Sequence, residues 1–357
     1  MTQQSTIWTT RCPIPNALSI ASARGELGAE LARHGVSLQS LATSTDPKVR
    51  QSHFVQSQPW FIRQGGNTPP LVSASKGRRV KILGLTFNSA GEGLYALPGS
   101  GIERPADIKG KRISLPRQVN DPVDFWQASV RHGVSHVLRQ TNLTEDDIEW
   151  VDVVIERTYV SRSTNSTDAA KTLWDSTFML GHQREEAAAL LDGRVDLIYS
   201  AGSIATLTAG FTGAERVIDV STETDPLKRV SNSTPALLTT TADLYEERPE
   251  LVELIVEHVL RSAEWARTNR PEARRIIGIE TGLPEDLVEN AWTSEVEERL
   301  VPDLDPVKIR ALELQVDFLG RNGFLDVPVQ LDDLIAPEPL ARAKARLAAA
   351  PVSEPAL

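Results

Sequence analysis

The fold is indicated most directly by one stretch of sequence, Leu190-Leu-Asp-Gly-Arg-Val-Asp-Leu-Ile198. A helix rich in alanine and leucine ends here, Gly193 terminates it, and a strand begins near Val195. A second stretch, Asp107-Ile-Lys-Gly-Lys-Arg-Ile113, has the same order of a helical turn, a glycine turn and a strand. Helices that alternate with short apolar strands are typical of parallel α/β structure.

The rest of the chain extends this alternation. Residues 5–10 predict a β-branched strand, which Pro13 and Pro15 end; a helix is then expected as far as Gly35, followed by a new strand at Val36. Apolar periodicity and turn residues predict further elements: a strand at 79–86, a helix at 124–140, and helices at 253–268, 286–298 and 306–321.

Length and composition limit the class of protein. The chain has 357 residues. A chain of this length is usually too long for a single hydrophobic core, so we expect two lobes. A net charge of −10 argues against a nucleic-acid partner. No apolar run reaches the roughly 18 residues of a spanning helix. Residues 1–8 carry neither a basic region nor an apolar core, so we expect a cytoplasmic protein whose single cysteine stays reduced.

That cysteine, Cys12, stands between the first strand and the first helix in Thr-Thr-Arg-Cys-Pro-Ile-Pro-Asn. On residue type alone a single cysteine is more often a small buried apolar residue than a nucleophile. The N–H groups of a helix start, with Arg11 beside them, would favour the thiolate. The position of Cys12 therefore favours its interpretation as a reactive thiol.

A second dense stretch spans residues 53–66. His53 supplies a proton-handling imidazole and Arg63 a fixed cation, although each alone would more often be a solvated loop residue. Gly65 and Gly66 predict a tight turn whose backbone N–H groups are free to bind an anion. Taken together, these groups predict a site for a small anion.

Metal and nucleotide cofactors are not expected. His132 and His136 lie four residues apart on a predicted helix, but no third ligand of suitable spacing is near, so a structural role is favoured. The chain also has no glycine-rich phosphate loop of the required spacing.

The two helix–glycine–strand stretches resemble the nitrate and taurine-type branch of the periplasmic-binding-protein superfamily. The resemblance implies an α/β, two-lobed, periplasmic-binding-protein-like (type II) fold with a ligand cleft between the lobes. We place the two crossings between lobes near residues 88 and 228. Lobe 1 then comprises residues 1–87 and 229–357, and lobe 2 comprises residues 88–228.

A more specific resemblance is carried by the N-terminal half. Its pattern is similar to the 2'-hydroxybiphenyl-2-sulfinate desulfinase family of the dibenzothiophene desulfurisation pathway, with Cys12-Pro-x-Pro-Asn-Ala-Leu18, His53-Phe54 and Gln58-Pro-x-x-x-Arg63-x-Gly65-Gly66-x-x-Pro-Pro-Leu71. The similarity continues at Phe125-Trp126 and at residues 190–200 and 299–302, so it covers almost the whole chain.

The resemblance implies a hydrolase acting on carbon–sulfur bonds, without cofactor or metal. Its reaction would release 2-hydroxybiphenyl and sulfite from 2'-hydroxybiphenyl-2-sulfinate, or act on a related aryl sulfinate, as the last step of the pathway. A monomer is implied, with a small molecule as its only partner and neither nucleic acid nor membrane bound. The residues carried over are the essential thiol Cys12, its partner His53, the sulfinate-holding groups Arg63, Gly65 and Gly66, and the ring-flanking side chains Phe54 and Trp126.

Two roles for Cys12 stay open. In the preferred hypothesis the thiol delivers a proton to the ring carbon as the C–S bond breaks, and His53 tunes or resupplies that proton. In the alternative the thiolate attacks sulfur and forms an adduct that water cleaves. A trapped enzyme–sulfur adduct would distinguish the two.

The chain departs from better-known family members at two places. Thr10-Arg11 replaces a small polar pair, so we expect an additional cation near the site. Ala201-Gly202 replaces a bulky aromatic residue, so we expect a larger or differently shaped pocket. The rival function is a non-catalytic binding protein for an organic sulfonate or sulfinate, against which the thiol and the N-terminus argue; a cytoplasmic sensor is a third candidate.

Overall fold

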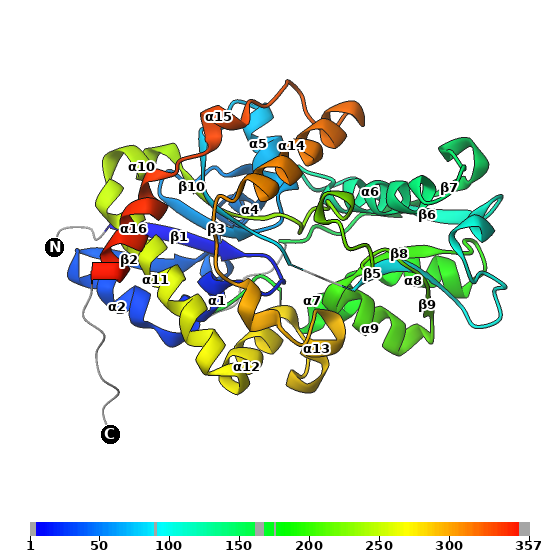
Figure 1. Cartoon of the computed structure of the whole chain (residues 1–357), viewed down its shortest axis with the longest axis horizontal. Coiled ribbons are helices and arrows are strands. Elements are labelled where there is room, and N and C mark those ends of the chain that lie inside the picture. Colours follow the sequence, from blue (N-terminus) through cyan, green and yellow to red (C-terminus); the bar gives the residue numbers. More distant parts are fainter. Residues whose placement is uncertain (1–4, 89–90, 161–167, 175, 350–357) are drawn as a thin grey trace.

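The strands form two groups that lie side by side along the long axis of the molecule (Figure 1). The structure is a computed structural model that describes residues 5–88, 91–160, 168–174 and 176–349. The first group is one five-stranded sheet, with spatial order β2 (Val36–Ser40), β1 (Ser5–Arg11), β3 (Phe61–Gly65), β10 (Ala236–Thr241) and β4 (Val80–Thr86). Strands β1, β2 and β3 are parallel, whereas β10 runs antiparallel to both of its neighbours.

Both faces of this sheet are covered, as a sheet built on parallel strands requires. Leu237 and Leu238 are neighbours on β10 and belong to different hydrophobic cores, because successive side chains of a strand point to opposite faces. The core of one face is completed by α1 (Ala17–Arg24), α2 (Glu26–Arg33), α10 (Ala242–Glu247), α11 (Pro249–Thr268), α12 (Arg270–Thr281), α13 (Val288–Ala291) and α16 (Glu338–Ala349). The core of the other face is completed by α5 (Thr68–Ser75), α14 (Pro306–Arg321) and α15 (Leu331–Leu334). The short helices α3 (Pro47–Arg50) and α4 (Ser52–Val55) precede β3.

The second group consists of two small sheets that meet. One has the order β8 (Ile198–Ala201), β5 (Glu92–Ala96), β9 (Glu215–Asp219), and the other pairs β6 (Arg112–Gln118) with β7 (Glu149–Ile155). An isolated parallel bridge between Ile113 of β6 and Leu197, the residue before β8, connects the two sheets. The accompanying helices are α6 (Phe125–Arg139), α7 (Ser176–Gly181), α8 (Arg184–Leu191) and α9 (Gly202–Thr212).

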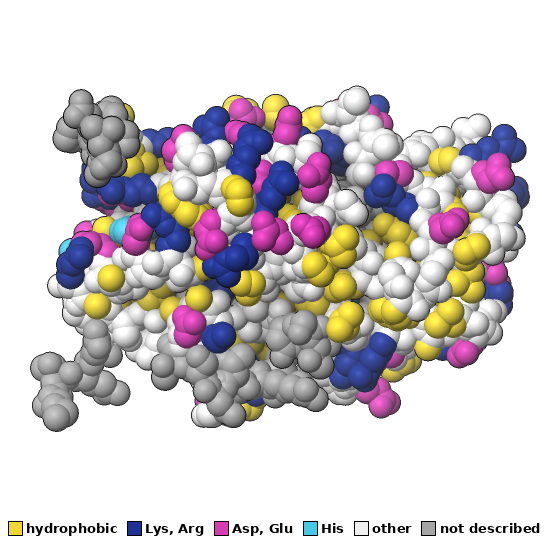
Figure 2. Space-filling view, turned by 90° about the horizontal axis from the view of Figure 1, so that it is seen from below, with side chains coloured by type: hydrophobic (Ala, Val, Ile, Leu, Met, Phe, Trp, Pro, Cys, Tyr) yellow, Lys and Arg dark blue, Asp and Glu magenta, His cyan; other side chains and the backbone are white. Residues whose placement is uncertain are grey.

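The two groups of strands occupy different parts of the chain. All strands of the first sheet fall within residues 5–86 and 236–241, and all strands of the second group within 92–219. We therefore propose that the chain crosses between lobe 1 and lobe 2 near residues 88 and 228. Within the described residues, no helix is both long and apolar enough to cross a membrane. Figure 2 shows positive and negative side chains intermixed on the face viewed from below.

Two helix predictions are wrong in detail. The helix expected up to Gly35 is broken into α1 and α2 at Gly25, which has the left-handed φ of 75° that glycine adopts without strain. The helix expected at 286–298 is reduced to the single turn α13. Its periodicity is overridden by Trp292, whose ring packs against Gly202 of lobe 2, where an added Cβ would lie 2.7 Å from the ring.

The expectation of an additional cation at the site is also wrong. Arg11 lies on β1, but its side chain is buried in an ion pair with Glu280 of α12, at 3.1 and 3.2 Å. Its remaining N–H groups donate to the carbonyl oxygens of Ala169 and Ala170. The charge is therefore neutralised on the side of β1 away from the thiol, and it fixes the strand end that carries Cys12.

The Arg11–Glu280 pair can be tested by removing its carboxylate. Glu280→Ala leaves a buried guanidinium without its counter-charge, so we expect the free energy of unfolding to fall by about 3–5 kcal/mol. Urea unfolding measures the loss. Glu272→Ala is the matched control on the same helix, because its pair with Arg275 is 49% and 52% exposed and is expected to contribute little to stability. Equal losses in the two variants would contradict this account.

Candidate active site

Cys12 directly follows β1, at the edge of the sheet where the parallel strands end. Its N–H donates to the carbonyl of Gln64 on the neighbouring strand β3, at 3.0 Å, which places the thiol beside the turn after β3. Gly65 makes this approach possible, because a Cβ at that position would collide with the Cys12 side chain. In folds of this kind ligands bind at the carboxyl ends of parallel strands, so Cys12 stands where a ligand is expected.

Three donors converge on the sulfur of Cys12. Arg63 Nη2 lies 3.1 Å from Sγ, the Gly66 N–H nitrogen 3.4 Å, and His53 Nε2 3.7 Å. None of them belongs to the first helix: α1 begins at Ala17 behind an Asn16 cap. The sequence predicted that N–H groups of the first helix would contact the thiol. The donors in the structure come instead from β3, from the turn after it, and from α4.

Arg63 is a buried cation on the central strand β3. Its Nη1 donates to the carbonyl of Gly66 at 2.7 Å, and Nε has no partner among the residues that the structure describes. Burial lowers the pKa of Arg63, and the interaction with Cys12 raises it. No carboxylate pairs with this guanidinium in the described part of the chain, so its charge is left for the sulfur or for a bound anion.

His53 is held in one orientation on α4. Its Nδ1 lies 3.1 Å from the hydroxyl of Thr10, and its ring meets Phe54 and Trp174 edge to face at centroid distances of 4.9 and 4.8 Å. Burial, and then the positive charge of Arg63, lower the pKa of His53 well below 6.5. The imidazole is therefore neutral at neutral pH and can pass a proton to or from the thiol.

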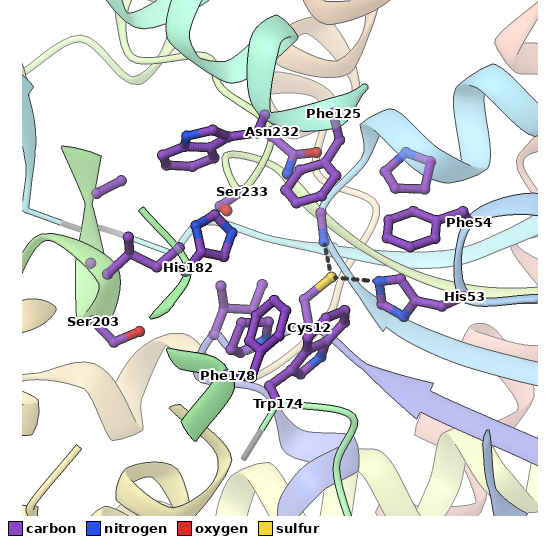
Figure 3. Close-up of a pocket in the computed structure, with 18 of the residues that line it drawn as sticks. Cys12, His53, Phe54, Phe125, Trp174, Phe178, His182, Ser203, Asn232 and Ser233 are labelled. Atoms are coloured by element: carbon purple, nitrogen blue, oxygen red, sulfur yellow. Dashed lines mark hydrogen bonds between the residues drawn. The ribbon is translucent and has the colours of Figure 1, made fainter. Parts of the chain in front are cut away.

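These groups open into a cavity with a volume of about 680 Å³, its mouth included (Figure 3). Of the residues expected at the site, Cys12, His53, Phe54, Gly66 and Trp126 line it, whereas Arg63 and Gly65 are not among the lining residues but contact or adjoin the thiol. Sequence reasoning did not assign further lining residues, which share aromatic or hydrogen-bonding side chains: Phe125, Trp174, Phe178, His182, Ser203, Asn232, Ser233 and Trp292.

The walls of the cavity come from both halves of the molecule. Phe54 of α4 stacks on Phe125 of α6, at a centroid distance of 5.8 Å and an angle of 23°. Ala201 and Gly202 also line the cavity, and the Trp292 ring occupies space beside Gly202 that a side chain there would need. Apolar and aromatic side chains therefore form the part of the cavity next to the polar groups at Cys12.

Trp126 is fixed by a buried carboxyl group. Its indole N–H donates to Glu186 of α8 at 2.8 Å, and the same carboxyl accepts from Ser114 and Gln183. Desolvation raises the pKa of Glu186 to about 7, although the three hydrogen bonds oppose the shift. The position of this aromatic wall thus depends on a polar group that does not itself line the cavity.

Asn232 is a polar lining residue that carries no motif in the sequence. Its Oδ1 accepts from the N–H of Thr68, at the start of α5, at 2.9 Å. That bond orients the amide and leaves its NH₂ group close above Gly66, where a Cβ would collide with it. Asn232 can therefore add a donor next to the Gly66 N–H and Arg63.

The two histidines considered as metal ligands lie elsewhere. The His132 ring stacks on Phe318 at 3.9 Å and on His136 at 4.8 Å, and His136 Nε2 lies 2.6 Å from the carbonyl oxygen of Val230. Among the residues described, no three His, Cys, Asp or Glu side chains gather as metal ligands would.

Comparison with known proteins places these features in a family. The model of the family described as NMT1/THI5 like matches residues 67–273. A 2'-hydroxybiphenyl-2-sulfinate desulfinase from Rhodococcus erythropolis is 28% identical over 358 residues, which span 94% of this chain and 92% of that protein.

Solved structures are similar over the whole chain. A mutant of the desulfurization enzyme DszB in complex with biphenyl-2-sulfinic acid matches with a TM-score of 0.74 at 27% identity, covering 96% of this chain and 100% of the other. A periplasmic sulfonate-binding protein, SsuA from Methylobacillus flagellatus KT, matches with a TM-score of 0.69 at 16% identity, covering 100% and 98%. The two-lobed binding-protein-like fold and the resemblance to the desulfinase are thereby confirmed.

The role of Gly65 can be measured at the thiol itself. Gly65→Ala adds a Cβ that pushes the sulfur away from Arg63 and the Gly66 N–H, the two donors that would assist its attack on an alkylating reagent. We expect the rate of alkylation by iodoacetamide at neutral pH to fall about tenfold. Cys12 is the only cysteine of the chain, so the bulk rate reports on it alone. Gly28→Ala on α2 is the control, since its Cβ meets nothing within 4 Å; the same rate in both variants would contradict the assignment.

The buried carboxyl under Trp126 predicts a pH dependence of stability. The folded protein keeps a proton on Glu186 that the unfolded chain, with a pKa near 4.5, releases between about pH 4.5 and 7. The contribution of this group to stability is therefore lost as the pH rises through about 7. Glu186→Gln does not ionise, and its amide can keep the bonds to Trp126 and Gln183.

We therefore compare the free energy of unfolding of Glu186→Gln with that of the wild type by urea unfolding. As the pH rises from about 5 to 8, the difference should shift by up to about 3 kcal/mol in favour of the variant. Glu185→Gln is the adjacent control, because that side chain is ion-paired with Arg157 and Arg184 and its loss brings no such gain. A pH-independent difference at Glu186 would rule the explanation out.

Proposed function

We propose that this chain, which belongs to the NMT1/THI5-like family, is an aryl-sulfinate desulfinase that releases sulfite from 2'-hydroxybiphenyl-2-sulfinate or a related aryl sulfinate. One observation carries the proposal. A single thiol stands at the end of an aromatic-walled cavity and contacts a buried arginine that has no carboxylate partner in the described chain. The relatives named as desulfinase and as a complex with biphenyl-2-sulfinic acid support the same reaction.

The cavity suits an anionic ring system. A sulfinate group would take its hydrogen bonds from Arg63 and from the Gly66 N–H, the two donors that otherwise contact the Cys12 sulfur. An arginine suits this task better than a lysine, because its fork of N–H groups can meet two oxygens at once. Phe54, Phe125 and Trp126 would flank the aromatic rings.

In the preferred mechanism Cys12 acts as the acid. Its S–H proton goes to the ring carbon that bears the sulfinate, the electrons of the C–S bond follow that carbon, and sulfur dioxide leaves and is hydrated to sulfite. Hydration of sulfur dioxide releases a proton; His53, neutral and 3.7 Å from the sulfur, would accept that proton and pass it to the thiolate. The Thr10 hydroxyl beside Nδ1 would hold the imidazole in place during this exchange.

The alternative mechanism uses Cys12 as a nucleophile. The thiolate bonds to the sulfinate sulfur, the aryl group leaves with the C–S electrons and takes a proton, and water cleaves the cysteine–sulfur adduct to thiol and sulfite. Arg63 and the Gly66 N–H, which contact the sulfur in the free protein, would also hold the sulfinate oxygens during this attack. A cysteine–sulfur adduct seen by mass spectrometry after rapid quenching would decide for this route.

The finer assignments follow from the reaction. Water enters the product sulfite and no redox change is needed, so we class the enzyme as a hydrolase acting on carbon–sulfur bonds that works without a cofactor. A catalytic thiol must stay reduced, which fits the cytoplasm. We propose further that the protein acts as a monomer, at the last step of dibenzothiophene desulfurisation. The rival function is a non-catalytic binding protein. That function does not explain why a thiol lies among the anion-binding donors.

The reaction and the thiol are tested together by measuring sulfite release from 2'-hydroxybiphenyl-2-sulfinate. Cys12→Ser is expected to lower kcat by at least about a thousandfold, because a serine hydroxyl neither ionises nor protonates carbon as a thiol does. Calorimetry should still find the substrate bound, since Arg63 and Gly66 remain. Gly28→Ala, on α2, controls for handling. Binding without turnover by the wild type would favour the binding-protein function.

A further inference from the structure

His182 is a histidine of the cavity wall that the reaction does not use. It lies between α7 and α8 and is 2% exposed. Figure 3 shows its ring on the other side of Cys12 from His53. No group in the described part of the chain forms a hydrogen bond with the ring, and Nδ1 is buried without a partner.

Aromatic rings surround this imidazole. Trp126 and Phe178 meet it edge to face at 5.0 and 5.5 Å, and Tyr159 lies 5.1 Å away. Burial, with a further effect of Arg157, lowers the pKa of His182 to about 3. The ring is therefore neutral, with one donor and one acceptor nitrogen, in surroundings that satisfy neither.

The polar neighbours of His182 are engaged elsewhere. Arg157 donates to the backbone carbonyl of His182 and to Glu185, not to the imidazole. The Glu186 carboxyl takes its bonds from Trp126, Ser114 and Gln183. A buried polar group left unpaired is costly, so its persistence in a cavity wall calls for a partner that enters the cavity.

We propose that His182 is a specificity-determining residue that hydrogen-bonds a hydroxyl group on the part of the aromatic substrate remote from the sulfinate. The proposal rests on the proposed function and assigns recognition of the remote hydroxyl group to one side chain of the cavity wall. A hydroxyl is the matching partner because it both donates and accepts, and so pairs with either tautomer of a neutral imidazole. A carboxylate can only accept and would suit a protonated ring, which this site disfavours.

The cavity has two regions with different chemistry. Cys12, Arg63 and Gly66 form the end that holds an anion, and His182 forms a neutral hydrogen-bonding point in the aromatic wall. Such a point discriminates strongly, because a ligand without the hydroxyl leaves the imidazole unpaired in the complex. Bulk alone, supplied by the aromatic residues, would discriminate much less.

The test compares two substrates that differ by one hydroxyl, 2'-hydroxybiphenyl-2-sulfinate and biphenyl-2-sulfinate. The quantity measured is the ratio of their kcat/KM values for sulfite release, together with the ratio of their Kd values from calorimetry. We expect the wild type to prefer the hydroxylated compound about tenfold. His182→Phe keeps the ring and removes both nitrogens, so the ratio should fall towards 1. His182→Gln restores a donor and an acceptor and should recover much of the preference.

Phe178→Leu is the matched control, since it alters the same wall without a polar atom and should change both substrates together. A ratio that is equal in the wild type and in His182→Phe overturns the proposal, and so does a wild-type ratio near 1. If neither compound is turned over, the proposed function fails, and the Kd ratio still decides the role of His182. Thermal unfolding of each variant confirms that it is folded before the ratios are compared.

Discussion

The structure depends on one constraint, the burial of the Arg63 charge within the central strand of the first sheet. A guanidinium in that position must meet negative or strongly polar atoms, and it finds the Gly66 carbonyl and the Cys12 sulfur. Among the described residues no carboxylate shares this task. The same charge helps to keep His53 neutral. A cation, a thiol and a neutral base are thus linked electrostatically before any ligand arrives.

The second half of the molecule supplies what this cluster lacks. Trp126 belongs to α6 and is fixed by Glu186 of α8. Trp126 and Phe54 of α4 line the cavity with aromatic rings next to its polar end. An apolar wall excludes water, and charge–dipole interactions are stronger where water is excluded. Arg63 of the first sheet therefore supplies the charge, and Trp126 of α6 helps to keep water away from it.

The sequence predicts a feature well when the residues that form it are close in the chain or share a motif, and poorly when they are far apart in the chain. Cys12, His53, Arg63 and Gly66 were within reach, because parallel strand ends meet at one edge of a sheet and a family motif covers these positions. Arg11 was misjudged, since its partner Glu280 lies 269 residues away. The helix expected at 286–298 failed because Trp292 leaves it to pack on Gly202. His182 carries no spacing signal at all; only the fold places it in the cavity wall.

The same fold serves proteins that only bind, so the difference between a binder and an enzyme must be local. A binding protein needs donors for the anion and a wall for the remainder, and both are present without Cys12. The thiol stands where an anion would sit, sharing Arg63 and the Gly66 N–H with it. In a pure binder that sulfur would compete with the ligand for its donors and weaken binding. The competition becomes useful only if the sulfur exchanges a proton or a bond with the ligand, which is the step that separates catalysis from capture.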